Sequence, residues 1–192
     1  GSVDVVISRT GYTGEDGCEL LVPCQAALEI WQRILDQGQS RGARPVGLAA
    51  RDTLRLEAGM PLYGHELSEQ IHPLQAGLSF AVQLDHRDFL GRDALVLAKS
   101  DTTCRRRVGL RLQDRRVPRE HYAVLRDGRL VGEVTSGTFS PTLDRPIAMA
   151  YVDPSACGVG QRLQVDIRGR QAPAEVVDLP FYARNSQRRN GT

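Results

Sequence analysis

The second half of the sequence contains six short segments rich in apolar and β-branched residues, separated by turn signals. They occupy residues 108–112, 122–125, 130–134, 147–152, 163–167 and 174–179. Asp127-Gly128, between the second and third segments, is typical of a two-residue β-hairpin turn. Short strands at this spacing predict a small antiparallel β-barrel or sandwich over residues 105–184.

In the first hundred residues the hydrophobic pattern differs, because strand-like and helix-like periods are mixed. Val3, Val5 and Ile7 alternate with other residues, and a second strand-like run covers 18–22. Apolar residues at helical spacing predict helices over 25–37, 48–58 and 91–98. We therefore expect an α+β domain over residues 1–100, the barrel over 105–184, and a frayed polar tail over 185–192.

Composition excludes several classes of protein. The 192 residues carry a formal net charge of only +2, so there is little electrostatic case for a nucleic-acid partner, and the run Arg105–Arg107 is expected to be solvated surface. No apolar run is long enough to predict a membrane span. The four cysteines form no CxxC and have no histidine at metal-ligand spacing, which predicts no metal site and a reduced, cytoplasmic protein.

Residues 10–20 read TGYTGEDGCEL, a glycine-rich turn that leads into a strand carrying an acid, Glu19. Glycines without a Cβ explain the turn. Two interpretations of Glu19 stay open at this point. It is either a solvent-facing residue of a half-buried strand, or a carboxylate that accepts two parallel N–H donors from a ligand, since a buried carboxylate needs a partner.

The predicted helix 48–58 carries Arg51 and Arg55 at a spacing of four residues, so the two are expected on one helix face. A solvated face is one explanation. Arg51 also lies near the helix start, where a cation is opposed by the helix dipole, so it is a candidate for meeting an anion instead. Elementary chemistry predicts no catalytic triad or phosphate loop here: GYTGEDG lacks the GK[ST] ending.

Several long motifs resemble the aminomethyltransferase (T-protein) family of the glycine cleavage system. The motifs, in the order of the family, are ISRTGYTGEDGCELLVP, GLAARDTLRLEAGMPLYGHEL, DFLGRDAL, GEVTSGTFSPTLDRPIAMAYV and LPFYAR. The resemblance covers nearly the whole chain. It implies the C-terminal part of a folate-binding α+β domain followed by a β-barrel, and the abrupt start at Val3 suggests a fragment.

The resemblance also implies an activity and partners. Family members transfer an aminomethyl group from the lipoyl group of the H-protein to tetrahydrofolate and release ammonia, as part of glycine catabolism and one-carbon metabolism. The lipoylated H-protein and tetrahydrofolate are therefore the expected partners, with no nucleic acid and no membrane.

By the same resemblance, Glu19 is expected to bind the pterin ring of folate and Tyr12 to line its pocket. The other expected folate-binding residues are Arg51, Arg184, Tyr63 and Phe80. The family's catalytic aspartate has no match, because it belongs to the N-terminal half. We therefore expect no catalytic residue in this chain and negligible transferase activity of the chain alone.

Two alternatives share the same fold. One is the folate-binding domain of a sarcosine or dimethylglycine dehydrogenase. The other is a non-enzymatic folate-binding iron–sulfur assembly factor, whose branch carries a KGCYxGQE-like motif where this chain has DFLGRDAL.

Overall fold

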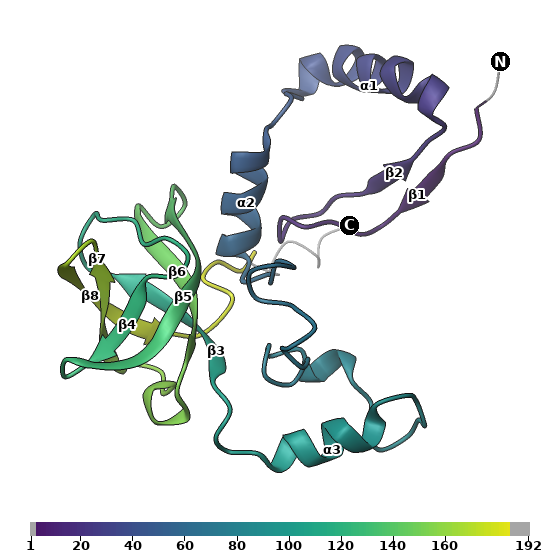
Figure 1. The fold of residues 1–192 in the computed structure, drawn as a ribbon. Coiled ribbons are helices and arrows are strands. Elements are labelled where there is room, and N and C mark those ends of the chain that lie inside the picture. The colour runs from purple at the N-terminus through teal and green to yellow at the C-terminus, as the bar shows by residue number, and fades with distance from the viewer. Residues whose placement is uncertain (1–2, 185–192) are drawn as a thin grey trace, which may run out of the picture. The chain divides into compact units, whose positions relative to one another are not determined.

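The computed structural model describes residues 3–184, which divide into two compact units. The first unit comprises residues 3–54 and Arg184, and the second comprises Arg55–Ala183. The division falls inside helix α2 (Leu48–Glu57). Each unit is described separately below, and both can be followed in Figure 1.

The first unit contains a short β-hairpin and a helix. Strands β1 (Val6–Ser8) and β2 (Glu19–Leu21) pair antiparallel, with Ile7 opposite Leu20. Helix α1 (Cys24–Gly38) follows, then the short 3-10 helix η1 (Gln39–Arg41) and the first residues of α2.

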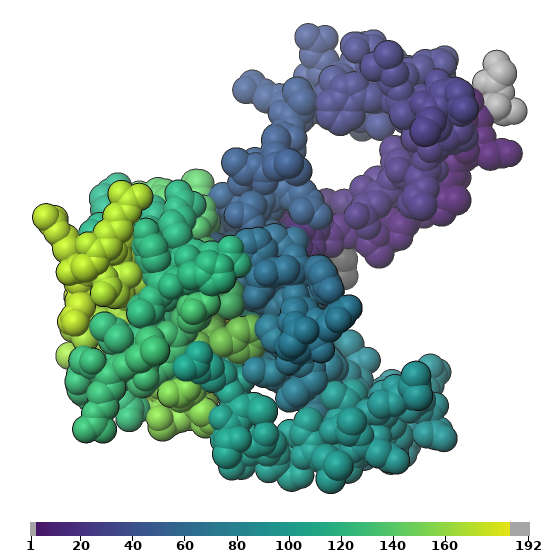
Figure 2. Space-filling model, in the orientation of Figure 1, coloured from purple at the N-terminus to yellow at the C-terminus, as the bar shows by residue number. Residues whose placement is uncertain are grey.

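Helix α1 has the expected apolar stripe along one face, but no other element of the first unit covers that face. No residue of α1, which is described throughout, is buried, and Leu28 is 78% exposed. Both strands of the hairpin are exposed except for the half-buried Ser8. Figure 2 shows open space between α1 and the hairpin. The secondary structure of this unit is thus formed by local sequence signals with little tertiary burial to stabilise it.

In the second unit, strands from residues 106 to 177 of the described chain close into a six-stranded antiparallel barrel with strand order β3-β6-β5-β4-β7-β8 (Figure 1). The strands are β3 (Arg106–Leu112), β4 (Ala123–Arg126), β5 (Arg129–Ser140), β6 (Arg145–Val152), β7 (Arg162–Ile167) and β8 (Arg170–Val177). The 3-10 helix η3 (Pro154–Ala156) lies between β6 and β7. Closure leaves the barrel without a free sheet edge.

The barrel interior is a continuous apolar core. In β7, Leu163, Val165 and Ile167 are buried while the residues between them are not, as the two-residue period of a strand requires. The same pattern in the other strands adds residues such as Leu110 and Val124, both with no exposed surface. A core of this kind supplies the main favourable free energy of folding.

Two glycines allow a close backbone approach that the barrel requires. A Cβ at Gly132 would lie 2.3 Å from the carbonyl oxygen of Tyr151, and one at Gly137 would lie 2.4 Å from that of Pro118. Neither backbone neighbour can move aside cheaply. Larger residues are therefore excluded at both positions of β5.

The outer side of the barrel packs against the end of α2 and the segment that follows. Leu56, Ile147 and Met149 form a second apolar cluster, and none of the three has any exposed surface. The segment continues through the 3-10 helix η2 (Ser79–Ala81) to helix α3 (Arg92–Ser100), which leads into β3.

Buried charges join this segment to β5 and β6. Arg55, only 1% exposed, donates to Glu66 at 3.0 Å and to Ser136 at 2.8 Å. Glu66 has no exposed surface and also accepts hydrogen bonds from Thr135 and from the Leu62 backbone N–H. Glu66 is therefore bound by further donors, and Arg55 by the acceptor oxygen of Ser136. Additional hydrogen bonds to both charges are the condition for tolerating a buried ion pair.

The carbonyl group of Glu66 accepts a hydrogen bond of 2.9 Å from the Tyr151 hydroxyl. Burial raises the pKa of Tyr151 to about 12, against the opposing effect of the Arg107 charge. The hydroxyl therefore remains a donor at physiological pH.

The predicted fold class is confirmed: an α+β part precedes a closed antiparallel barrel. Several bounds differ from the expectation. The strand expected from Val3 begins at Val6, and the strand expected over 130–134 runs to Ser140 because β5 pairs along its length with β6. The expected domain boundary at residues 100–105 stays a prediction. The tail expected to be frayed, 185–192, lies outside the described residues.

Candidate functional site

The glycine-rich turn connects the two strands of the first unit, and Glu19 is the first residue of the second of them. Its side chain is exposed and accepts a hydrogen bond from the Thr10 hydroxyl through Oε2. Thr10 Oγ1 also lies 2.9 Å from the Ser8 hydroxyl. Among residues 3–184, the other carboxylate oxygen, Oε1, has no hydrogen-bond partner. Of the two interpretations of Glu19, the isolated chain thus presents the solvent-facing one, with one acceptor oxygen still available.

Tyr12 and Arg51 come together across the first unit. The guanidinium carbon of Arg51 lies 4.7 Å from the centroid of the Tyr12 ring, a cation–π distance. At this distance the electron-rich face of the ring attracts the guanidinium charge. Arg51 has no carboxylate partner in the described part of the chain, so its N–H groups remain available to an acceptor.

Arg184, the residue at the C-terminal end of the described chain, contacts the same glycine-rich turn. It forms an ion pair with Asp16, and its Nε lies 3.7 Å from a carboxylate oxygen of Glu15. Both pairs are partly solvent-exposed, so each contributes little stability. Their effect is to hold Arg184 against the turn that precedes Glu19.

Four of the six expected site residues therefore belong to the first unit: Tyr12, Glu19, Arg51 and Arg184. Tyr63 and Phe80 belong to the second unit, where their side chains are 70% and 84% exposed. At this exposure neither aromatic side chain lines an enclosed pocket in the described structure, and their expected role in folate binding stays a prediction.

Arg51 and Arg55 do not share one kind of environment, although both lie in α2. Arg51 is exposed, whereas Arg55 is buried in the ion pair with Glu66. The interpretation of both as one solvated helix face is wrong for Arg55. Arg55 is one turn further along the helix than Arg51, and it is buried together with Leu56 and Glu57 where the barrel covers the end of the helix.

Sequence reasoning also missed the buried acids Glu57 and Glu66. Glu57 accepts hydrogen bonds from the side chains of Ser140 and Thr142. One signal was available in the sequence: the motif GLAARDTLRLEAGMPLYGHEL contains the two acids, and the stretch VTSGTFSPT contains several serine and threonine residues that can donate to them. These acids are bound by donors within the fold and have a structural role.

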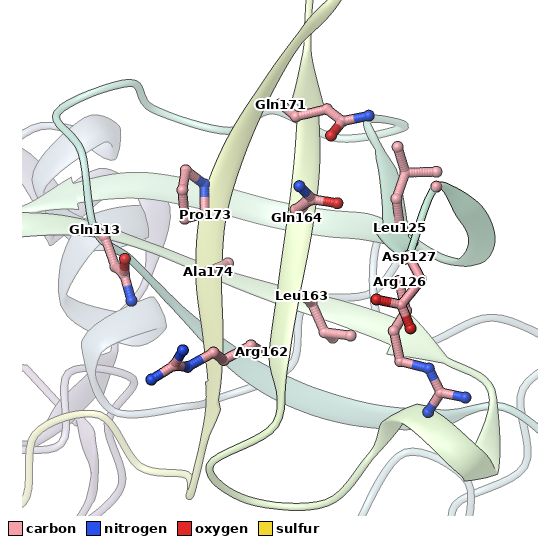
Figure 3. Close-up of a pocket in the computed structure, with 11 residues that line it drawn as sticks. Gln113, Leu125, Arg126, Asp127, Arg162, Leu163, Gln164, Gln171, Pro173 and Ala174 are labelled. Carbon is pink, nitrogen blue, oxygen red and sulfur yellow. The ribbon is translucent and has the colours of Figure 1, made fainter.

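A hollow of about 640 Å³ lies on the barrel surface and includes none of the expected site residues. Figure 3 shows Gln164 and Gln171 over β7 and β8, with Arg126 and Asp127 at the adjacent turn. Arg126 donates to the carbonyl oxygen of Ser155 at 2.7 Å. The lining is polar without a concentration of one charge, and we assign it no role.

Residues 3–184 contain no group of three or more histidine, cysteine or acidic residues arranged to hold a metal ion. The four cysteines are free thiols. Within that same range, no helix has the length and hydrophobicity to cross a bilayer.

Comparison with known families gives two matches along the chain. The GCVT N-terminal domain model matches residues 1–86, and the glycine cleavage T-protein C-terminal barrel domain model matches residues 105–183. The second match covers the six barrel strands described above.

Individual relatives agree with these matches. The aminomethyltransferase of Symbiobacterium thermophilum is 51% identical over 183 residues, which is 95% of this chain and 49% of the relative. That of Synechococcus elongatus is 54% identical over 182 residues, covering 94% of this chain and 48% of the relative. The chain thus spans about half the length of the curated relatives it matches.

A solved structure shares the fold as well. The crystal structure of glycine cleavage system aminomethyltransferase T from Bartonella henselae has a TM-score of 0.85 and 38% identity, over 93% of this chain and 50% of that chain. With both domain models matched in order and named relatives at this identity, the chain belongs to the glycine cleavage T-protein family.

Proposed function

We propose that this chain is the folate-binding and barrel portion of an aminomethyltransferase of the glycine cleavage system. The reaction transfers an aminomethyl group from the lipoyl group of an H-protein to tetrahydrofolate, which releases ammonia and forms methylenetetrahydrofolate. The family membership supports the class of reaction, and the relatives named aminomethyltransferase favour it over the dehydrogenase and assembly-factor alternatives. The proposed location is the cytoplasm.

The single observation that carries the substrate assignment is the available carboxylate of Glu19. A pterin ring presents a ring N–H beside an exocyclic amino group, and a carboxylate can accept from both at once. Oε1 of Glu19 is available, and Oε2 is oriented by the Thr10 hydroxyl. A bidentate contact of this type fixes the orientation of the ring as well as its position.

Arg51 and Tyr12 complete the proposed contact surface. A guanidinium group only donates hydrogen bonds, so Arg51 suits the acceptor groups of folate, which are its ring carbonyl and its carboxylates. Tyr12, stacked against Arg51, supports the guanidinium plane and offers an aromatic surface to the ligand. Arg184 is a positioning residue in this scheme, since it acts through its ion pairs with the turn.

The proposed chemistry needs a proton-transferring acid that this chain does not supply. Asp16 is held by Arg184 and Asp52 belongs to a separate motif, so neither takes that role. We therefore propose that the 192-residue chain binds folate weakly and has negligible transferase activity by itself. Half of a cleft loses part of the contact area of the whole.

The experiment is a calorimetric titration of the chain with tetrahydrofolate, which measures the Kd. Glu19→Gln replaces one acceptor oxygen with a donor that faces the pterin donors, and we expect the Kd to rise by about tenfold, because an unpaired polar group costs about 1–3 kcal/mol. Glu29→Gln is the matched control, since Glu29 is an exposed acid whose only ion pair among residues 3–184 is with Arg33 of the same helix.

Equal affinities of the Glu19→Gln variant and the parent chain would refute the assignment. Where affinity of the parent chain is too weak to measure, the same substitution is made at the aligned position of the Synechococcus elongatus relative. Formation of methylenetetrahydrofolate by the isolated chain, supplied with tetrahydrofolate and with H-protein whose lipoyl group carries the aminomethyl group, would refute the expected inactivity.

A further inference from the structure

The second unit contains a hollow of about 300 Å³ beside the start of the barrel. Three segments form it: the loop over residues 72–79, the end of α3, and the residues that lead into β3. Its lining includes His72, Lys99, Arg105, Arg106 and Arg107. The volume is at the lower end of the range for small-molecule sites.

The lining carries a clear excess of positive charge. Lys99 and Arg106 have no carboxylate partner among residues 3–184. Arg105 pairs with Asp153 at 3.0 Å through Nε only, which leaves its terminal N–H groups available. Of the run Arg105–Arg107, which is predicted to be solvated surface, Arg105 and Arg106 are exposed and Arg107 is half-buried. All three line one hollow together with Lys99, the single lysine of the sequence.

One wall of the hollow is held rigidly by Arg107. Its guanidinium group donates to the carbonyl oxygens of Ala76 and Gly59, each at 2.7 Å. These bonds fix the loop against β3 with neutral acceptors, so the charge of Arg107 is not cancelled by them. Arg105 is thus held by its ion pair with Asp153, and Arg107 by hydrogen bonds to backbone carbonyl groups.

The one acid in the lining, Asp101, is already engaged. It accepts hydrogen bonds from the Thr103 backbone N–H at 2.8 Å and from the Cys104 thiol at 3.0 Å. The Cys104 contact, followed by those of Thr103, lowers the pKa of Asp101 to about 2. Asp101 is therefore ionised, and its single negative charge offsets only part of the positive charge of the lining.

His72 also lines the hollow. Its Nδ1 accepts the backbone N–H of Gln75 at 3.1 Å, so in the neutral ring the proton lies on Nε2. That Nε2 is buried and has no hydrogen-bond partner within the described chain.

We propose that this hollow is a binding site for a doubly charged oxyanion, a phosphate group or a dicarboxylate, held by Lys99, Arg105 and Arg106. Guanidinium groups bind both kinds of oxyanion through paired N–H donors. The site lies entirely in the second unit and uses none of the residues proposed to bind folate, so it stands independently of that proposal.

The test is a titration of the full chain with inorganic phosphate and, in a second arm, with glutarate, at constant ionic strength maintained with sodium chloride. Backbone amide NMR signals of residues 99–107 report binding. We expect saturable shifts confined to these residues and to the loop around His72. In the double variant Lys99→Gln/Arg106→Gln we expect the Kd to rise by about tenfold, since each lost charged hydrogen bond is a large fraction of such an affinity.

The matched control is the double variant Arg129→Gln/Arg162→Gln, which removes the same charge from exposed barrel positions outside this hollow. The site is supported if binding saturates in either arm, is weakened in Lys99→Gln/Arg106→Gln and is unchanged in the control variant. The arm with the lower Kd then identifies the preferred anion. Shifts that rise linearly in both arms, or equal weakening in the two double variants, would show only general charge screening and overturn the proposal.

Discussion

The two units of this chain share one type of sequence pattern but use it differently. In the barrel, alternating residues of each strand are buried, and Leu110, Val124 and Val165 have no exposed surface. In the first unit, α1 also carries an apolar stripe along one face, yet none of its residues is buried. The comparison teaches that an amphipathic pattern specifies a face, whereas burial depends on what covers that face.

The same contrast holds for charged groups. In the second unit the buried pair Arg55–Glu66 has further hydrogen-bond partners, such as Thr135, which donates to Glu66. In the first unit the charged groups, including Glu19, Arg51 and Arg184 of the candidate site, lie at the surface. The buried ion pair and the charged candidate folate-binding residues therefore belong to different units. This separation can be tested by changing one unit at a time.

The largest effect is expected from Glu66→Gln. The substitution removes the carboxylate charge that lies 3.0 Å from the buried guanidinium group of Arg55, and breaking a buried ion pair costs about 3–5 kcal/mol. Urea denaturation, with the free energy of unfolding extrapolated to water, measures this. A loss below about 1 kcal/mol, the range of surface pairs, would contradict the structural role given to the pair.

A pair of leucine substitutions compares the units directly. Leu110→Ala should lower the free energy of unfolding by about 2–5 kcal/mol, because Leu110 is fully buried in the barrel. Leu28→Ala, in the exposed stripe of α1, should change it by no more than about 0.5 kcal/mol. Similar losses for both, measured in the same urea titrations, would show that α1 is covered in solution.

Trp31 provides a probe of the first unit alone, since it is the single tryptophan of the chain and is 49% exposed on α1. We expect its fluorescence transition at a lower urea concentration than the far-UV circular dichroism transition, to which the barrel contributes most of the β-structure. Non-coincident transitions are evidence against two-state unfolding. Coincident transitions would mean that the two units unfold together.

The smallest effect is expected at His121. A hydrogen bond of 2.8 Å to Glu133, aided by the charge of Glu120, raises the pKa of His121 above 6.5. A raised pKa in the folded state stabilises it below pH 6.5, and this contribution is lost as the pH rises through the folded-state value. His121→Asn, which tolerates the positive φ at this position, should reduce the pH dependence of unfolding above pH 6.5.

Glu133→Gln removes the partner and should reduce the pH dependence in the same way. Both slopes are measured from urea titrations at a series of pH values. An unchanged slope in the two variants would assign the pH dependence to other groups.

The sequence alone determined the elements whose signals are local. Asp127-Gly128 predicted a hairpin turn, and both residues have positive φ in the structure. The helix stop at Gly59 and the strand alternation of β7 likewise follow from neighbouring residues. Motif resemblance also led to the candidate residues Tyr12 and Arg51, which the structure brings into contact.

Tertiary structure decided what local signals leave open. Arg51 and Arg55 are equivalent in the helical pattern, and only packing against the barrel buries one and leaves the other exposed. The hollow lined by Lys99, Arg105 and Arg106 receives another wall from the loop over residues 72–79, which is distant from them in the sequence. The physical reason is that helix and strand periods are set by bonds between residues near in sequence, while the burial of a charge depends on surfaces contributed by residues far away in the chain.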